Sequence, residues 1–141
     1  MEKERILILG VTGMLGHTLF KEMNKNENFE VFGTTRNKNS LKDYFTLEEL
    51  SRIRDGVDAD NFETVIRAIA SVQPTIIINC IGIIKQLPIS RDPLTAITVN
   101  AQLPHRLSLV TRTAKARLIH ISTDCVFDGK KAIGFYNIND K

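Results

Sequence analysis

The stretch Arg5-Ile6-Leu7-Ile8-Leu9-Gly10-Val11-Thr12-Gly13-Met14-Leu15-Gly16-His17 decides the fold of this 141-residue chain. An apolar run, a turn with regularly spaced glycines and a further apolar segment predict a buried strand, a tight turn and a helix. We expect Gly10 to turn the chain off the strand, Gly13 to leave room for a phosphate beside the backbone, and Gly16 to let the helix pack closely. Because a helix N-terminus offers free N–H donors, the sequence predicts a turn that binds the pyrophosphate of a dinucleotide.

The glycine spacing, Gly-x-x-Gly-x-x-Gly, differs from the commoner Gly-x-Gly-x-x-Gly fingerprint. A βα turn that is rich in glycine but binds nothing is therefore the alternative interpretation. The residues after the turn favour binding, since Leu15, Leu19, Phe20 and Met23 follow at helical spacing. Strand, turn and helix thus fall in the order that phosphate binding requires.

Composition narrows the class of protein. The apolar fraction of 43% suits one domain with a core, which we expect to span residues 1–141. The net charge of +3 comes from scattered side chains without a basic block, so we expect no nucleic-acid partner. The sequence has no run that could span a membrane and no Cys/His spacing typical of a metal site. Cys80 and Cys125 adjoin apolar runs, which favours reduced thiols in a cytoplasmic protein, with a disulfide as the alternative.

Strand and helix patterns alternate along the chain. We predict strands at residues 29–34, 75–80 and 118–122, a short strand just before Asp58, and helices at 14–25 and 47–53. A further helix is expected to be capped by Asp60 and to carry Phe62, Val65, Ile66 and Ile69 on one face. Another helix should begin near Asp92-Pro93, kink or restart at Pro104, and end near Ala114. This alternation predicts an α/β fold, a Rossmann-like doubly wound parallel sheet in three αβα layers.

The residues that follow the predicted strands indicate the ligand. In an open α/β sheet, ligands bind beyond the carboxyl ends of the strands, where residues 10–16, 34–36, 79–85 and 122–124 should meet. The second strand ends on Arg36, and a basic residue there would attract the 2′-phosphate of a dinucleotide. We therefore expect NADP(H) in preference to NAD(H). A solvent-exposed arginine without a ligand is the alternative.

Four motifs resemble those of a known family in the same order. They are Gly10-Val11-Thr12-Gly13-Met14-Leu15-Gly16, Ile78-Asn79-Cys80-Ile81-Gly82, Val99-Asn100-Ala101 and Ile121-Ser122-Thr123-Asp124-Cys125-Val126-Phe127-Asp128-Gly129. Together they resemble the extended short-chain dehydrogenases, most closely the dTDP-4-dehydrorhamnose reductase (RmlD-like) branch. The resemblance implies an oxidoreductase of nucleotide-sugar metabolism, in dTDP-rhamnose biosynthesis.

The resemblance also implies roles for individual residues. The backbone of residues 12–15 would hold the pyrophosphate, Asp58 and Ala59 would border the adenine, and residues 80–82 would line the ribose and nicotinamide path. Asn100 would brace the central helix against the neighbouring strand. The expected cofactor-binding set is Gly10, Thr12, Gly13, Met14, Leu15, Gly16, Arg36, Asp58, Ala59, Cys80, Ile81, Gly82 and Asn100. Thr123 occupies the catalytic Ser/Thr position, with Asp124 and Lys85 on the substrate side.

The chain departs from the family pattern in two places. Cys125 stands where many relatives carry an aromatic residue, and the family's Tyr-x-x-x-Lys pair is missing, because Tyr136 and Lys141 have the wrong spacing. We therefore expect the chain to be an N-terminal portion, truncated before the Tyr-x-x-x-Lys helix and the substrate-binding part, and inactive alone.

Two functions remain open from the sequence. In the first, the chain is the cofactor-binding portion of an NADPH-dependent reductase whose partner is a nucleotide-linked 4-keto sugar. Thr123 would stabilise the developing alkoxide, and a tyrosine from the missing part would supply the proton. In the second, the chain is a non-catalytic nucleotide-binding or regulatory protein on the same fold, similar to the regulatory subunits of methionine adenosyltransferase. Either function is compatible with a homodimer.

Overall fold

The computed structural model describes residues 3–84 and 88–122. Within these residues, strands β1 (Glu4–Leu9), β2 (Phe29–Thr34), β3 (Ile53–Arg54), β4 (Ile76–Asn79) and β5 (Arg117–His120) form one sheet in the order β3-β2-β1-β4-β5. Every paired strand runs parallel to its neighbour. The order reverses between β1 and β4, which is the position where doubly wound sheets bind their ligands. The predicted α/β fold is confirmed.

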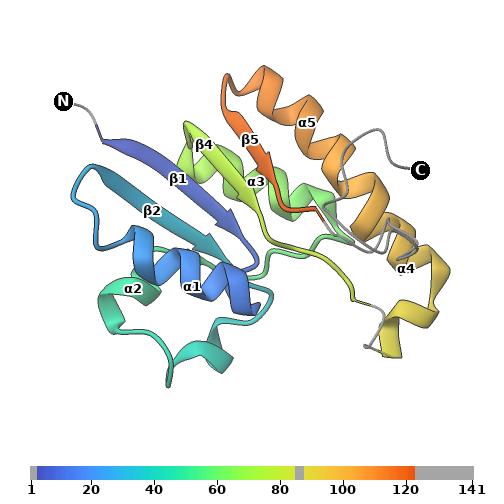
Figure 1. Ribbon diagram of the computed structural model, residues 1–141, viewed down its shortest axis with the longest axis horizontal. Coiled ribbons are helices and arrows are strands. Elements are labelled where there is room, and N and C mark those ends of the chain that lie inside the picture. The colour runs from blue at the N-terminus through green and yellow to red at the C-terminus, as the bar shows by residue number, and fades with distance from the viewer. Residues whose placement is uncertain (1–2, 85–87, 123–141) are drawn as a thin grey trace, which may run out of the picture.

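Helices cover both faces of the sheet (Figure 1). Helices α1 (Met14–Met23) and α2 (Leu47–Ser51) lie on one face, and α3 (Phe62–Val72) and α5 (Leu103–Thr113) lie on the other. A short helix α4 (Pro93–Ile97) and a π-helical segment (Thr98–Gln102) lead into α5. Among the described residues, no helix is long and apolar enough to cross a membrane.

The alternation of side chains along β1 builds two cores. Ile6 and Ile8 pack on the α1 face with Phe20, whereas Leu7 and Leu9 pack on the face of α3 and α5. All five side chains are fully buried. Because both faces of the sheet are covered, β1 has no polar alternation and reads as a continuous apolar run. Each such side chain contributes about 1.5–3 kcal/mol through burial.

The structure corrects the predictions for residues 47–61. The helix predicted at 47–53 ends at Ser51, because Ile53 pairs with Gly33 in β3 and is buried. The short strand therefore lies at 53–54 and not directly before Asp58. The cap prediction for Asp60 is wrong, since Asn61 is the N-cap of α3 and the Asp60 N–H donates to Asp58 Oδ1.

The remaining boundaries differ less from prediction. Helix α1 ends at Met23, two residues early, where the Asn24 side chain donates to the Phe20 carbonyl. Strands β4 and β5 are shorter than the predicted 75–80 and 118–122. Helix α4 begins at Pro93, as predicted, and Asp92 caps it by accepting from the N–H groups of Leu94 and Thr95. Pro104 lies in the first turn of α5, so this helix restarts here, which is one of the two predicted alternatives.

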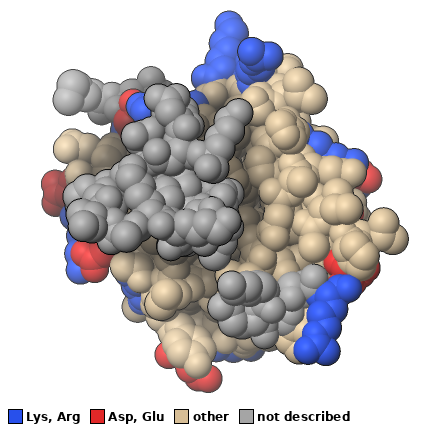
Figure 2. Space-filling model, turned by 45° about the vertical axis from the view of Figure 1, so that its right-hand side comes forward, with Lys and Arg blue, Asp and Glu red and all other residues tan. Residues whose placement is uncertain are grey.

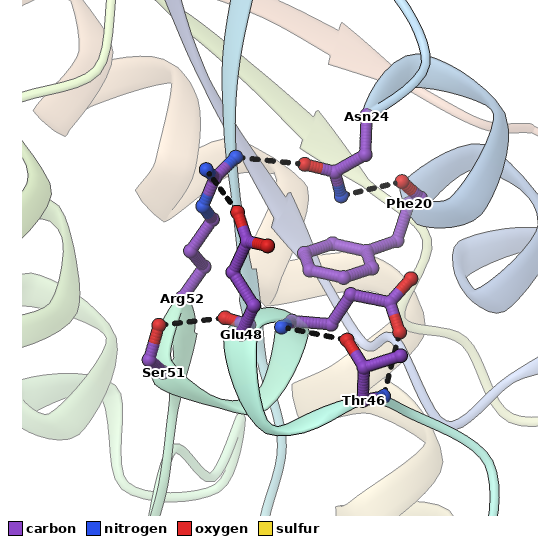
Figure 3. A network of polar contacts seen from close by, with 7 residues as sticks. Phe20, Asn24, Thr46, Glu48, Ser51 and Arg52 are labelled. Atoms are coloured by element: carbon purple, nitrogen blue, oxygen red, sulfur yellow. Dashed lines mark hydrogen bonds and ion pairs between the residues drawn. The ribbon is translucent and has the colours of Figure 1, made fainter.

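A polar network fixes α2 against α1 (Figure 3). Thr46 and Glu49 form a capping box at the start of α2, and Lys21 Nζ of α1 lies 2.8 Å from Glu49 Oε2. Arg52 donates to Glu48 and, at 3.1 Å, to the Asn24 side chain at the end of α1. The segment between β2 and β3 is therefore held by charged contacts to α1.

Glu49→Gln should weaken this network in a pH-dependent way. Burial alone raises the pKa of Glu49, but hydrogen bonds from Lys21 and Thr46 outweigh it and lower the pKa below its ordinary value. A carboxyl whose pKa falls on folding stabilises the fold above its unfolded pKa of about 4.3, and this contribution is lost as the pH falls through the folded-state value. We expect Glu49→Gln to lower the free energy of unfolding by about 1 kcal/mol at pH 7. The difference from the parent chain should shrink towards zero below about pH 4.

Urea unfolding at a series of pH values measures this effect. The matched control is Glu22→Gln, because Glu22 pairs with Lys25 through an exposed contact at 2.6 Å that should contribute little. Equal losses for both variants at pH 7 would contradict the role of the Glu49 network.

Candidate functional site

The turn after β1 is fixed by contacts to both neighbouring strands. Gly10 has a φ of +85°, a conformation that favours glycine, as predicted for a sharp turn off the strand. Its N–H donates to Thr34 Oγ1 at 3.1 Å, and the Val11 N–H donates to the Thr34 carbonyl at 3.0 Å. On the other side, the Cys80 N–H donates to the Leu9 carbonyl at 3.1 Å. The turn therefore lies at the carboxyl edge of the sheet, between the ends of β2 and β4.

The fold requires two of the three glycines of the turn. A Cβ at Gly16 would lie 2.2 Å from the Gly10 carbonyl oxygen, so only glycine allows α1 to pack this closely on the turn. By contrast, Gly13 has φ −76° and ψ 156°, which any residue adopts, and a Cβ there would lie an ordinary 3.6 Å from the same oxygen. Packing among the described residues does not explain Gly13. Its missing side chain leaves the N-terminus of α1 open.

That N-terminus can take an anion. Gly13 is the N-cap of α1 and supplies no side-chain cap, and the first turn contains no acidic residue. The first N–H groups of a helix have no partner within the helix and carry partial positive charge. Chemically, the arrangement suits a phosphate group at the backbone N–H groups of Met14 and Leu15, in the first turn of α1.

A cavity of about 250 Å³ opens beside the turn, at the carboxyl ends of the strands. Of the predicted cofactor residues, the following line it: Gly10, Thr12, Gly13, Arg36, Asp58, Ala59, Cys80, Ile81 and Gly82. Met14, Leu15, Gly16 and Asn100 are outside this lining, the first three in the opening turn of α1. The predicted Thr123, Asp124 and Lys85 lie outside the described residues.

Some lining residues escaped the sequence analysis. They are Val57, Asp60, Ile89, Thr95 and Val99. Val57 and Asp60 flank the predicted pair Asp58-Ala59, so extending that pair by one residue on each side would have found them. Ile89, Thr95 and Val99 belong to the segment that leads into α5. Val99 is part of the motif Val99-Asn100-Ala101, whereas the sequence around Ile89 and Thr95 gave no indication of a cavity.

Both basic and acidic side chains line the cavity. Arg36 is the only basic residue among the described lining residues, is exposed, and forms no ion pair within the described part of the chain. Asp58 and Asp60 also line the cavity. Burial raises the pKa of the Cys80 thiol, so this side chain is neutral at pH 7. Arg36 is thus free to pair with an anionic group of a ligand.

Asn100 joins the helical segment to the loop after β4. Its Oδ1 accepts from the Ile83 N–H at 2.8 Å, and its Nδ2 donates to the Ile83 carbonyl at 2.8 Å. Asn100 lies in the π-helical segment Thr98–Gln102, where the wider turn changes the register of the helix before α5. The residue thereby connects this helix to the cavity wall, although it does not line the cavity itself.

Asn79 and His120 connect the ends of β4 and β5. The buried Asn79 side chain accepts from the Ile81 N–H through Oδ1, and its Nδ2 lies 3.1 Å from His120 Nδ1. Because the Ile81 contact assigns Oδ1, Nδ2 must donate, and His120 Nδ1 must accept. The His17 ring packs on Phe45, with 4.8 Å between the ring centroids.

The described residues indicate neither a basic patch on the face in Figure 2 nor a metal site. On the face shown in Figure 2, lysine and arginine side chains lie around the margin of the molecule and do not gather into one patch among the described residues. Within residues 3–84 and 88–122, no three His, Cys, Asp or Glu side chains converge in a way that could hold a metal ion.

Known proteins are similar to this chain in sequence and in fold. A family model described as "RmlD substrate binding domain" matches residues 4–141. The chain is 31% identical over 127 residues to methionine adenosyltransferase 2 subunit beta from Danio rerio, covering 89% of this chain and 35% of that protein. It is 29% identical over 136 residues to dTDP-4-dehydrorhamnose reductase from Aggregatibacter actinomycetemcomitans, covering 96% of this chain and 40% of that protein.

A solved structure agrees with these relatives. The crystal structure of dTDP-4-dehydrorhamnose reductase from Bacillus anthracis in complex with NADP superposes with a TM-score of 0.70 at 26% identity. The match covers 94% of this chain and 40% of that one. The chain thus spans 35% to 40% of the length of these relatives.

Proposed function

The chain belongs to the RmlD substrate binding domain family, and we propose that it forms the cofactor-binding part of an NADPH-dependent reductase of a nucleotide-linked 4-keto sugar. One observation carries this proposal. The fold accounts for Gly10 and Gly16, whereas the open space at Gly13 lies at an uncapped helix N-terminus beside a cavity that contains a free arginine. A dinucleotide with an additional phosphate accounts for both features.

The residues at the cavity fit the parts of NADPH. We assign the pyrophosphate to the backbone N–H groups of residues 12–15, the adenine to Asp58 and Ala59, and the 2′-phosphate to Arg36. Residues 80–82 would line the path of the ribose and nicotinamide. When bound, NADPH would supply a hydride for reduction of the keto carbon. Gly16 and Asn100 do not line the cavity but would support it. Gly16 lets α1 pack closely on the turn, and Asn100 holds the backbone of Ile83.

The substrate end of the site is assigned from the family motif. The Thr123 hydroxyl would donate to the sugar oxygen as it becomes an alkoxide, and Asp124 and Lys85 would contact the sugar. We propose that a tyrosine from a further part of the protein supplies the proton. The 141-residue chain is therefore expected to bind cofactor without turning over a 4-keto sugar.

Arg36→Ala tests the preference for NADPH. The charge-assisted hydrogen bonds of an arginine with a phosphate contribute about 1.5–3 kcal/mol, so NADPH affinity should fall by roughly ten- to a hundredfold. NADH affinity should change less than about twofold, because NADH lacks the 2′-phosphate. Isothermal titration calorimetry with each cofactor measures both effects.

The matched control is Arg112→Ala, which removes an exposed arginine in the last turn of α5, outside the cavity lining. This variant should bind both cofactors like the parent chain. An equal loss of NADPH and NADH affinity in Arg36→Ala would overturn the role of Arg36 as a clamp for the 2′-phosphate.

A non-catalytic regulatory protein on the same fold is the second candidate. The similarity to methionine adenosyltransferase 2 subunit beta, at 31% identity, favours this candidate. Sequencing the gene beyond the codon for Lys141 distinguishes the two. A downstream Tyr-x-x-x-Lys pair would support the reductase, and its absence would support the regulatory protein.

A further inference from the structure

We propose that Thr64, the third residue of α3, is a positioning residue that fixes the Asp58-Ala59 wall of the cavity and so sets a preference for adenine over a 6-oxopurine base. This inference rests on the proposed function, because it concerns the base of the same dinucleotide. Thr64 is outside the cavity lining, so it would act through the backbone and carboxylate of Asp58.

The Thr64 hydroxyl bridges the turn that forms this wall. Its Oγ1 accepts from the Asp58 N–H at 2.9 Å and lies 3.1 Å from the Asp58 carbonyl and 2.7 Å from the Asn61 carbonyl, to which it can donate. One hydroxyl therefore touches both ends of the turn over residues 58–61. The Asn61 N–H closes the same turn by donating to the Asp58 carbonyl at 3.1 Å.

Thr64 takes over a task that a cap residue usually performs. Asn61 is the N-cap of α3, yet its side chain makes no cap hydrogen bond. The first turn of α3 is instead tied to the preceding loop by the Thr64 side chain. On the other side, the Val57 N–H donates to the Thr35 carbonyl at 2.9 Å, which anchors the wall to the residue after β2. The wall is thus held at both ends.

In this wall, one carboxylate oxygen and one backbone N–H remain available to a ligand. Asp58 Oδ1 accepts from the Asp60 N–H at 3.0 Å, while Oδ2 and the Ala59 N–H have no hydrogen-bond partner among the described residues. One free acceptor beside one free donor matches the edge of adenine, whose amino group donates and whose N1 accepts. The edge of hypoxanthine carries the opposite pattern, an acceptor at O6 and a donor at N1. The wrong base would leave both protein groups unpaired, and unpaired polar groups carry a large penalty.

Thr64→Val and Thr64→Ser on the full chain test this inference. Valine keeps the shape of threonine without the hydroxyl, so Asp58 N–H loses its acceptor and the wall loses its tie to α3. We expect Thr64→Val to bind NADPH about tenfold more weakly than the parent chain. Its affinity ratio of NADPH to the hypoxanthine analogue of NADPH should fall severalfold. Thr64→Ser should restore both values.

The matched control is Thr113→Val, which removes an exposed hydroxyl that contacts the Leu109 carbonyl within α5. This variant should keep the parent affinity and ratio. If Thr64→Val does not fold, Thr64→Ala also lacks the hydroxyl and is favourable in a helix. Its affinity ratio then provides the same test.

The outcomes separate this inference from the proposed function. If the parent chain binds neither dinucleotide, the proposed function fails, and this inference fails with it. If the parent chain prefers NADPH to its hypoxanthine analogue and the hydroxyl-free variants keep that ratio, the role of Thr64 is wrong and the proposed function stands. A reduced ratio that Thr64→Ser restores supports the inference.

Discussion

Gly16→Ala is expected to destabilise the chain by at least about 3 kcal/mol, because the new methyl group would meet backbone and not a movable side chain. A Cβ at Gly16 would lie 2.2 Å from the Gly10 carbonyl oxygen and 2.9 Å from the Gly10 carbonyl carbon. Relief requires α1 to move away from the turn. That movement would withdraw the fully buried Phe20 from the core. Thermal unfolding should show a melting temperature roughly 10 °C lower, and urea unfolding a matching loss of free energy.

Gly13→Ala is the control that separates fold from function. The backbone at Gly13 suits alanine and the new Cβ has room, so the free energy of unfolding should stay within about 0.5 kcal/mol of the parent value. Under the proposed function, the same methyl group would occupy the space of the pyrophosphate and weaken NADPH binding at least tenfold. Equal stability losses for Gly13→Ala and Gly16→Ala would contradict the packing argument for Gly16.

The parts of the fold that could be predicted from the sequence are those whose signal is local. The strand β1, its glycine turn and α1 lie next to one another in the chain, and burial on both faces gives β1 and β4 their apolar runs. The structure of residues 47–61 depends on contacts with residues distant in the sequence. Ile53 joins β3 because it pairs with Gly33, twenty residues away along the chain, and a two-residue strand has no period of its own. Local patterns therefore favoured a longer helix there.

The residues of the candidate site also fall into a group that the sequence indicated and a group that it did not. Arg36 and Cys80 follow strands, so the rule that ligands bind beyond the carboxyl ends of parallel strands found them without a structure. Thr95 and Val99 reach the cavity from helical segments. Their position depends on how the segment before α5 packs on the loop after β4, including the two hydrogen bonds between Asn100 and Ile83. The motif around Asn100 indicated a brace here, but it did not indicate that Thr95 would reach the cavity, because that depends on packing between segments distant in the sequence.

Asn79→Leu is the second substitution with a large expected effect. The Asn79 side chain is fully buried and provides the acceptor for the Ile81 N–H at 3.1 Å. Leucine has a similar size but leaves that N–H without an acceptor and removes the link to His120. We expect the free energy of unfolding to fall by about 2–3 kcal/mol, measured by urea unfolding at pH 7. Under the proposed function, NADPH affinity should fall as well, because Cys80 and Ile81 line the cavity.

The two hydrogen bonds of Asn79 should contribute unequally, and His120→Ala distinguishes them. His120 is exposed, so water can replace the imidazole as the acceptor for Asn79 Nδ2, and this variant should lose less than about 1 kcal/mol. The bond to Ile81 is different, because it fixes the backbone where the chain leaves β4 and enters the cavity wall. A loss in His120→Ala as large as that in Asn79→Leu would show that the contact between β4 and β5, and not the contact within the wall, carries the stability of this edge.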